Sequence, residues 1–153
     1  MHHNTEVLYF IQQIVKLYEN RLKEVGKRHA LTHLETDIVA FLHNNPGKDT
    51  ASDIVNLRRL QKGNVSLAVE SLLQKGLLQR YHDQQDRRRI HLFLTPAAQP
   101  ILAEITAMRT QLQQGLFAGF TPSEQALYEA FTSRIMANTL TLFGSEALSH
   151  ADR

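Results

Sequence analysis

The 153-residue sequence contains no cysteine and no long apolar run. The absence of cysteine excludes disulfides, thiolate ligands for a metal and thiol-based sensing of oxidants. No apolar run approaches the roughly 18 residues that a transmembrane helix needs. The first residues also lack the basic region and apolar core of a signal peptide. We therefore expect a cytoplasmic protein with no membrane partner.

Motifs of hydrolysis and group transfer are absent as well. No Gly-rich phosphate loop follows a predicted strand, and neither Gly-x-Ser-x-Gly nor His-Glu-x-x-His occurs. The eight histidines raise the alternative of a metal site. His29 and His33 have the spacing of one helix face, but a predicted helix cap at Thr32 lies between them and breaks that geometry. We expect no enzymatic activity, no cofactor and no metal.

The length and the hydrophobic fraction of 42% fit one domain, residues 1–153, with a sizeable core. The formal net charge of +2 is unevenly distributed. Residues 1–49 carry six basic and six acidic side chains, residues 50–95 carry eight and four, and residues 96–153 carry three and five. The middle segment therefore holds the positive excess that contact with phosphates requires.

This basic segment predicts two short helices in succession. The first is expected over about 51–60, after a capping box that opens at Thr50. After a sharp turn, the second runs over about 62–75, and Gly76 supplies the left-handed position that ends it. Residues at helical spacing mark its buried face: Val65, Ala68, Val69, Leu72 and Leu73.

A β-hairpin is predicted next. Strands are expected over 77–82 and 89–94, because apolar and polar residues alternate in the second, and a charged loop joins them. A very short extra strand near Asp49 is a further alternative. Helix, tight turn, helix and basic hairpin together define a winged helix-turn-helix, whose second helix has the length and polarity to lie in a DNA major groove.

Three runs of this region resemble the multiple-antibiotic-resistance-regulator (MarR) family of bacterial transcription factors. They are Lys62-Gly-Asn-Val-Ser, Leu72-Leu-Gln-Lys-Gly-Leu-Leu-Gln-Arg and Asp86-Arg-Arg-Arg-Ile-His-Leu-Phe-Leu-Thr. The Asp-x-Arg pair of Asp86 and Arg88, followed by Leu94 and Thr95, is the most specific part. The resemblance extends over nearly the whole chain. It implies a mainly α fold with a small β-hairpin wing, and a dimer.

Long helices are expected on both sides of this DNA-binding lobe, which spans about 31–95. The dimerisation helices are placed at about 5–26 and 97–143. A capping box of Thr121 with Glu124 restarts the chain within the second range, and a frayed tail is expected from Gly144. The first helix is apolar over more than one face and therefore needs two covering surfaces. Pairing with a second copy in a C2 dimer would bury that surface.

The start of the second helix of the motif carries the candidate base contacts. It lies at the positive end of the helix dipole, where free amides suit phosphates and base edges. Asn64 can pair with adenine, Ser66 can donate or accept, and Leu67 can meet a thymine methyl group. The alternative is a solvated helix face, which the adjoining wing disfavours. The candidate helix contacts are Lys62, Gly63, Asn64, Ser66 and Leu67.

The loop between the strands holds three consecutive arginines, Arg87, Arg88 and Arg89. A charge run is usually a solvated loop, but at a hairpin tip it can reach an adjacent minor groove. The resemblance implies that Arg88 enters the groove and that Asp86 orients it through a salt bridge. Arg87 or Arg89 would then meet phosphate. Arg80 either braces the wing or contacts the DNA backbone.

The resemblance also implies an effector cleft between the dimerisation helices and the DNA-binding lobe, open to small aromatic, phenolic or lipophilic molecules. The candidate lining residues are Tyr9, Tyr18, His33, Phe41 and Met108. The alternative is that these side chains pack the core.

The resulting hypothesis is a sequence-specific regulator of transcription. We expect a repressor that binds a pseudo-palindromic operator on double-stranded DNA as a homodimer and is released by a small aromatic or lipophilic effector. The alternative is a winged-helix protein-interaction or architectural DNA-binding module without an effector.

Overall fold

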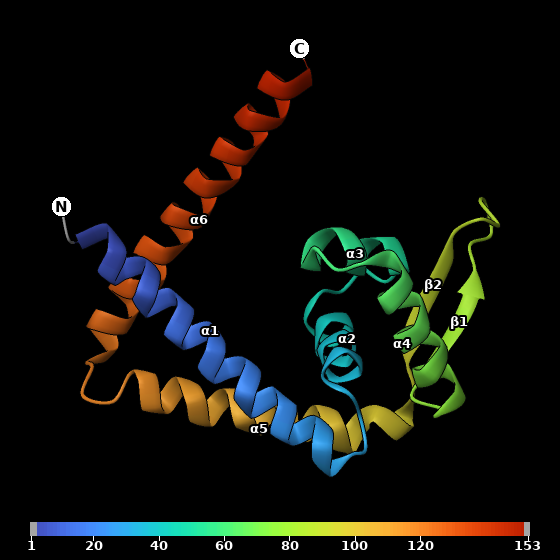
Figure 1. Ribbon diagram of the computed structural model, residues 1–153. Helices are drawn as coiled ribbons and strands as arrows, with labels where there is room; N and C mark the ends of the chain where they lie inside the picture. The colour runs from blue at the N-terminus through green and yellow to red at the C-terminus, as the bar shows by residue number, and fades with distance from the viewer. Residues whose placement is uncertain (1–2, 152–153) are drawn as a thin grey trace. The chain divides into compact units, whose positions relative to one another are not determined.

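A computed structural model describes the backbone of residues 3–151 and the side chains of residues 5–144. The elements of this part of the chain are α1 (His3–Arg28), α2 (His33–Asn44), α3 (Ala51–Arg58), α4 (Lys62–Gln74), β1 (Leu78–His82), β2 (Ile90–Leu94), the 3-10 helix η1 (Pro96–Ala98), α5 (Gln99–Leu116) and α6 (Pro122–Ala151) (Figure 1). Strands β1 and β2 form an antiparallel hairpin. The predicted mainly α fold with a small β-hairpin is confirmed.

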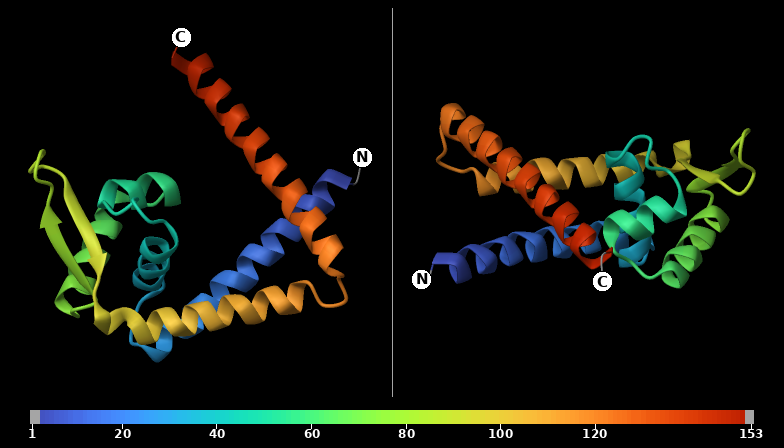
Figure 2. Two further views of the ribbon diagram at one scale, coloured as in Figure 1. Left: turned by 180° about the vertical axis from the view of Figure 1, so that it is seen from behind. Right: turned by 90° about the horizontal axis from the view of Figure 1, so that it is seen from above.

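The chain forms two compact units, residues 1–112 and 113–153. The first contains α1 to α4, the hairpin and most of α5, and the second contains the end of α5 and all of α6. Within the first unit the hairpin projects beside α4 (Figure 2). No helix among the described residues has the length and apolarity to cross a membrane. The expected arrangement as a single domain stays a prediction.

Local sequence signals set where three helices begin. In each case a threonine hydroxyl accepts from the backbone N–H three residues later, and the acidic side chain there accepts from the threonine N–H. This reciprocal pairing satisfies two amides that the first turn leaves without partners. The predicted capping boxes are thus present: Thr32 with Glu35, Thr50 with Asp53, and Thr121 with Glu124.

The end of α1 differs from the prediction. The helix does not stop near Gly26 but continues to Arg28, and Ala30 takes the left-handed conformation after it, with φ of 54°. Gly26 lies where α1 approaches the start of α2. A Cβ built there would lie 2.2 Å from the hydroxyl oxygen of Thr36, which is fully buried. The glycine therefore allows a close helix–helix contact rather than a helix end.

Replacing Gly26 by alanine is expected to lower the free energy of unfolding by about 1–3 kcal/mol, the usual cost of overpacking. Urea unfolding at a fixed protein concentration measures it. The matched control is Gly115→Ala on α5, where a Cβ meets nothing within 4 Å. That variant should gain up to about 1 kcal/mol from helix propensity. Equal stabilities of the two variants would contradict the close approach.

The last helix also differs from the prediction. We expected a frayed tail from Gly144, but the α6 backbone continues to Ala151. The reason is local, because the run Ser-Glu-Ala-Leu-Ser-His-Ala contains good helix formers and no proline, which outweigh one glycine.

The core lies in the first unit and is shared between the helix-turn-helix and its flanking helices. The large apolar side chains with no more than 1% exposure come from α1, α2, α3, α4 and α5. They are Leu22, Val25, Ile38, Val39, Ile54, Val65, Leu72 and Ile105. One core therefore joins α3 and α4 to α1, α2 and α5.

The first half of α1 and the whole described part of α6 present large apolar side chains to solvent. On α1, Leu8 is 62% exposed and Phe10 is 54% exposed, as the prediction of more than one apolar face requires. On α6 the exposed set includes Leu127, Tyr128, Phe131, Ile135, Met136 and Leu140. Apolar patches of this kind mark surfaces that associate with another molecule.

Candidate nucleic-acid interface

Helix α4 has one buried and one exposed face. Of the five residues predicted to be buried, Val65, Ala68, Val69 and Leu72 are buried against the core, and Leu73 is half-buried. The five predicted DNA contacts on this helix, Lys62 to Asn64, Ser66 and Leu67, are all exposed. Leu67 is 73% exposed, so an apolar side chain stands in water at the centre of a polar surface. The structure therefore gathers the predicted helix residues on one open face.

The N-terminus of α4 is available to an acceptor. Its N-cap residue, Gln61, makes no side-chain cap hydrogen bond. Instead the Gln61 amide oxygen accepts from the Asn64 side-chain amide at 3.3 Å, which places Asn64 beside the start of the helix. Gln61 carries no clear signal in the sequence, because glutamine is not a typical N-cap residue.

The C-terminal end of α4 is fastened to α2. The Lys75 ammonium group donates to the carboxylate of Glu35 at 2.8 Å and to the carbonyl of Ala30 at 3.1 Å. Burial alone would raise the pKa of Glu35, but hydrogen bonds from Lys75, Ser71 and the Thr32 backbone lower it below its usual value. The ion pair of Lys75 with Glu35 therefore holds the C-terminal end of α4 against α2.

A second ion pair fastens α3 to α2. The Arg58 guanidinium donates to both carboxylate oxygens of Asp37, with distances of 2.5 and 3.1 Å. Arg58 therefore braces α3 against α2. Arg59 ends α3 in the left-handed conformation, with φ of 51°. This residue starts the sharp turn between the helices.

The wing is braced against α4. Arg80 on β1 donates to the Glu70 carboxylate on α4 at 2.6 Å, so this arginine braces the wing. At the base of the hairpin, the hydroxyl of Thr95 donates to the carbonyl of Gly76 at 2.6 Å. The Leu-Thr pair that closes the wing therefore has a structural role, because it ties the end of β2 to the turn after α4.

The wing loop is ordered by its own carboxylates. Asp83 accepts from the backbone N–H groups of Gln85 and Asp86, at 2.8 and 3.0 Å. Asp86 in turn accepts from the backbone N–H of Arg88 at 3.0 Å. The orienting contact from Asp86 thus reaches the Arg88 backbone, whereas the resemblance implied a salt bridge between the two side chains. Arg87, Arg88 and Arg89 are all exposed.

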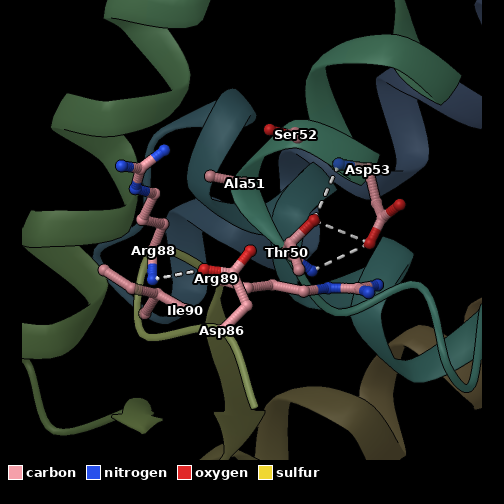
Figure 3. Close-up of a pocket in the computed structure, with 8 residues that line it drawn as sticks. All are labelled: Thr50, Ala51, Ser52, Asp53, Asp86, Arg88, Arg89 and Ile90. Atoms are coloured by element: carbon pink, nitrogen blue, oxygen red, sulfur yellow. Dashed lines mark hydrogen bonds between the residues drawn. The ribbon is translucent and has the colours of Figure 1, made fainter. Parts of the chain in front are cut away.

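A cleft of about 460 Å³ separates the wing from the start of α3 (Figure 3). Arg88 and Arg89 extend from the wing along this cleft. On the opposite side the helix begins with the capping box of Thr50 and Asp53. The cleft brings together eight residues: Thr50, Ala51, Ser52, Asp53, Asp86, Arg88, Arg89 and Ile90. Both arginines are therefore carried by the wing on the side that faces the helix-turn-helix.

The predicted extra strand near Asp49 is present as a single bridge, Thr50 with His91. The backbone N–H of Leu92 donates to the Asp49 carbonyl at 2.8 Å. Strand β2 is thus held on one edge by β1 and on the other by the segment before α3.

The five candidate effector-pocket residues lie in different environments. Phe41 and Met108 belong to the hydrophobic core, so packing accounts for them. Tyr9 and His33 are exposed. Tyr18 is half-buried against the core, and burial raises the pKa of its phenol. Among the described residues, no group of three or more His, Cys, Asp and Glu side chains is placed to hold a metal.

These features define a winged helix-turn-helix protein. A sequence model described as the MarR family matches residues 30–89, which contain α2 to α4 and most of the wing. Residues 30–89 thus match the MarR family of DNA-binding transcriptional regulators, and the resemblance found in the sequence is confirmed there. This family and the relatives below are regulators of transcription and not enzymes.

Two relatives of known name are similar to nearly the whole chain. The transcriptional regulator PecS of Dickeya dadantii is 22% identical over 131 residues, which are 84% of this chain and 79% of PecS. The uncharacterised regulator YsmB of Bacillus subtilis is 20% identical over 129 residues, covering 84% of this chain and 88% of YsmB.

Solved structures share the fold. A MarR transcriptional regulator from Methanosarcina mazei has a TM-score of 0.75 at 14% identity, covering 90% of this chain and 99% of that one. The MepR–DNA complex of S. aureus has a TM-score of 0.65 at 20% identity, with 85% and 96% covered. BpsR of Bordetella bronchiseptica, whose DNA binding is regulated by 6-hydroxynicotinic acid, has a TM-score of 0.62 at 21% identity, with 86% and 98% covered.

Proposed function

We propose that this regulator is a cytoplasmic repressor that binds a pseudo-palindromic operator as a homodimer and is released by a small aromatic or lipophilic effector. The observation that carries the proposal is the open face at the start of α4 beside a braced, arginine-bearing wing. The face would read base edges in a major groove, and the wing would reach the adjacent minor groove.

The chemistry of each predicted contact supports these separate roles of α4 and the wing. Asn64 offers a donor and an acceptor to adenine, and Leu67 offers an apolar contact to a thymine methyl group. Lys62 at the positive end of the helix suits a phosphate. Arg88 suits a narrow minor groove, whose negative potential attracts arginine. The solved MepR–DNA complex shows that a protein of this fold binds DNA.

The homodimer is supported by the exposed apolar side chains of α1 and α6. Side chains such as Phe10, Phe131 and Ile135 would be buried between two copies. Two recognition helices would then address half-sites about one helical turn apart. Sedimentation equilibrium tests this state directly, and a monomer at micromolar concentration would remove it from the proposal.

Release by a ligand is supported by a relative. BpsR is a protein of this fold whose DNA binding is regulated by a small aromatic acid. In this chain, Tyr18 is half-buried against the core, and its phenol would offer a polar group to such a molecule. A ligand that prefers one dimer conformation would lower operator affinity by its differential affinity for the two conformations.

The test is fluorescence anisotropy of the protein on DNA from upstream of its own gene and on shuffled DNA, across a salt series. A specific regulator should prefer the upstream DNA by about a thousandfold or more, while both affinities fall with salt. Equal affinity for the two DNAs would favour the alternative, an architectural or protein-interaction module. Addition of phenolic acids to the complex then tests release.

A further inference from the structure

His91 on β2 lies between two carboxylates from different segments. Its Nδ1 atom is 2.7 Å from Asp49 Oδ1, and its Nε2 atom is 3.0 Å from Asp83 Oδ2. Asp49 precedes α3, whereas Asp83 belongs to the wing loop. Only 13% of the His91 side chain is exposed. One imidazole therefore connects the wing loop to the helix-turn-helix.

This geometry requires the protonated ring. An ionised carboxylate only accepts hydrogen bonds, so both ring nitrogens must donate, and both are donors only in the imidazolium form. The hydrogen bond from His91, together with those from the Asp86 and Gln85 backbone, lowers the pKa of Asp83 to about 2. Hydrogen bonds to Asp83 and Asp49 raise the pKa of His91, against partial burial.

Apart from the two carboxylates, the His91 imidazole contacts an aromatic ring. On β1, the Tyr81 ring stacks on the imidazole, with centroids 5.0 Å apart, and stacks also on Phe93. The charges that act on the imidazole are those of Asp49 before α3 and Asp83 in the wing loop. Both favour the imidazolium.

The contact continues to the wing tip. The second oxygen of Asp83 accepts from the backbone N–H of Asp86 at 3.0 Å. The Asp86 carboxylate accepts from the backbone N–H of Arg88 at 3.0 Å. Asp49, His91, Asp83, Asp86 and Arg88 thus form one hydrogen-bonded series from the segment before α3 to the arginine proposed to enter the minor groove.

We infer that His91 is a positioning residue for the wing, and that its imidazolium form holds Arg88 ready for DNA, so that operator affinity falls as the pH rises. The DNA part of this inference rests on the proposed function. The histidine itself touches neither base nor phosphate in this scheme and acts through Asp83 and Asp86.

The direction follows from the raised pKa of His91. Its stabilising contribution is fully present below the ordinary histidine value of 6.5 and is lost as the pH rises through the raised value. Above that value one ring nitrogen presents a lone pair to a carboxylate, and one of the two hydrogen bonds is lost. The wing loop is then less ordered in the free protein, and DNA binding must supply that ordering.

The first test is a pH series of operator anisotropy at constant ionic strength. The wild type is expected to lose about fivefold in operator affinity as the pH rises through the His91 pKa, a coupling at the low end of those between linked sites. His91→Gln should have a flat profile in this range. The matched control is His82→Gln, the neighbouring wing histidine whose Nδ1 lies 3.0 Å from the Arg87 carbonyl. It should keep the wild-type profile.

Asp49→Asn provides a second variant that keeps the shape of the site. It removes one of the two charges that raise the pKa of His91, so the midpoint of the pH profile should move to lower pH. A wild-type profile in both His91→Gln and Asp49→Asn, with specific operator binding intact, would overturn the inference and leave the proposed function standing.

A readout without DNA separates the two proposals. In the free protein, ¹⁵N NMR of the His91 ring should show two N–H groups at low pH and a titration midpoint above that of an ordinary histidine. Amide exchange of the wing loop should quicken above that midpoint in the wild type only. If the protein does not discriminate operator from shuffled DNA, the proposed function fails. Independently of DNA, the positioning role would be refuted by a His91 titration midpoint equal to that of an ordinary histidine, or by amide exchange of the wing loop that does not depend on pH.

Discussion

Replacing Arg88 by alanine is expected to lower operator affinity by about 1–3 kcal/mol, roughly five- to 150-fold. The guanidinium would be lost from the minor groove, whereas the loop should keep its conformation, because Asp83 and Asp86 hold it through backbone N–H groups. Anisotropy on operator DNA measures the loss, and circular dichroism checks the fold.

Two further substitutions distinguish phosphate contacts from base contacts at the same interface. Arg87→Ala is the matched wing control, because a phosphate contact should weaken operator and shuffled DNA alike and reduce the salt slope by about one. Asn64→Ala should instead reduce the preference for the operator, because it would remove the proposed base contact. Identical behaviour of all three variants would argue against separate base-reading and phosphate-binding roles.

Replacing Leu72 by alanine is expected to lower the free energy of unfolding by about 2–5 kcal/mol, since the leucine is fully buried and its removal leaves a cavity. Leu67→Ala on the same helix is the matched control. Leu67 is 73% exposed, so its loss should change stability by no more than about 0.5 kcal/mol.

The same two variants should have the opposite order of effect on operator affinity. Leu67→Ala should weaken operator binding through loss of the thymine methyl contact, while folded Leu72→Ala protein should retain it at low temperature. Urea unfolding at one fixed protein concentration gives the stabilities, because the proposed dimerisation would make them concentration-dependent. A large loss of stability in Leu67→Ala would show that α4 faces the core differently.

The sequence was most informative where structure depends on neighbours along the chain. The capping boxes at Thr32, Thr50 and Thr121 placed three helix starts, and the change from helical to alternating periodicity placed the hairpin. Gly76 was correctly interpreted as a left-handed helix end, with φ of 71°. Each of these features needs only a few adjacent residues, which is why periodicity and turn chemistry sufficed.

Contacts between distant residues were not predictable in the same way. Gly26 looks like a helix end in the sequence, and only the packing of α1 on α2 shows that it accommodates Thr36. The Arg58–Asp37 pair joins residues 21 apart, and His91 joins Asp49 across 42 residues. No local pattern distinguishes such side chains from ordinary exposed charges, because their role depends on the tertiary fold.

For the DNA interface, the sequence identified residue types that the structure gathers on one face of α4 and on the wing. It did not identify the supports behind them. Gln61, Glu70 and Asp83 contact predicted site residues or brace the wing, but glutamine, glutamate and aspartate are common on any protein surface. Their spatial neighbours give them these roles, and those neighbours become visible only in the folded chain.

The two ion pairs on α2 have a mechanical consequence. Both helices of the helix-turn-helix, α3 and α4, are fastened to α2 over a shared core, by the pairs Arg58 with Asp37 and Lys75 with Glu35. Bending α4 relative to α3 would break a pair whose acidic partner is largely buried, and that is costly. An effector of the proposed kind would therefore change the separation of the two DNA-binding lobes in the proposed dimer, rather than the shape of either lobe. Operators with one base pair added or removed between half-sites would then respond differently to the same ligand.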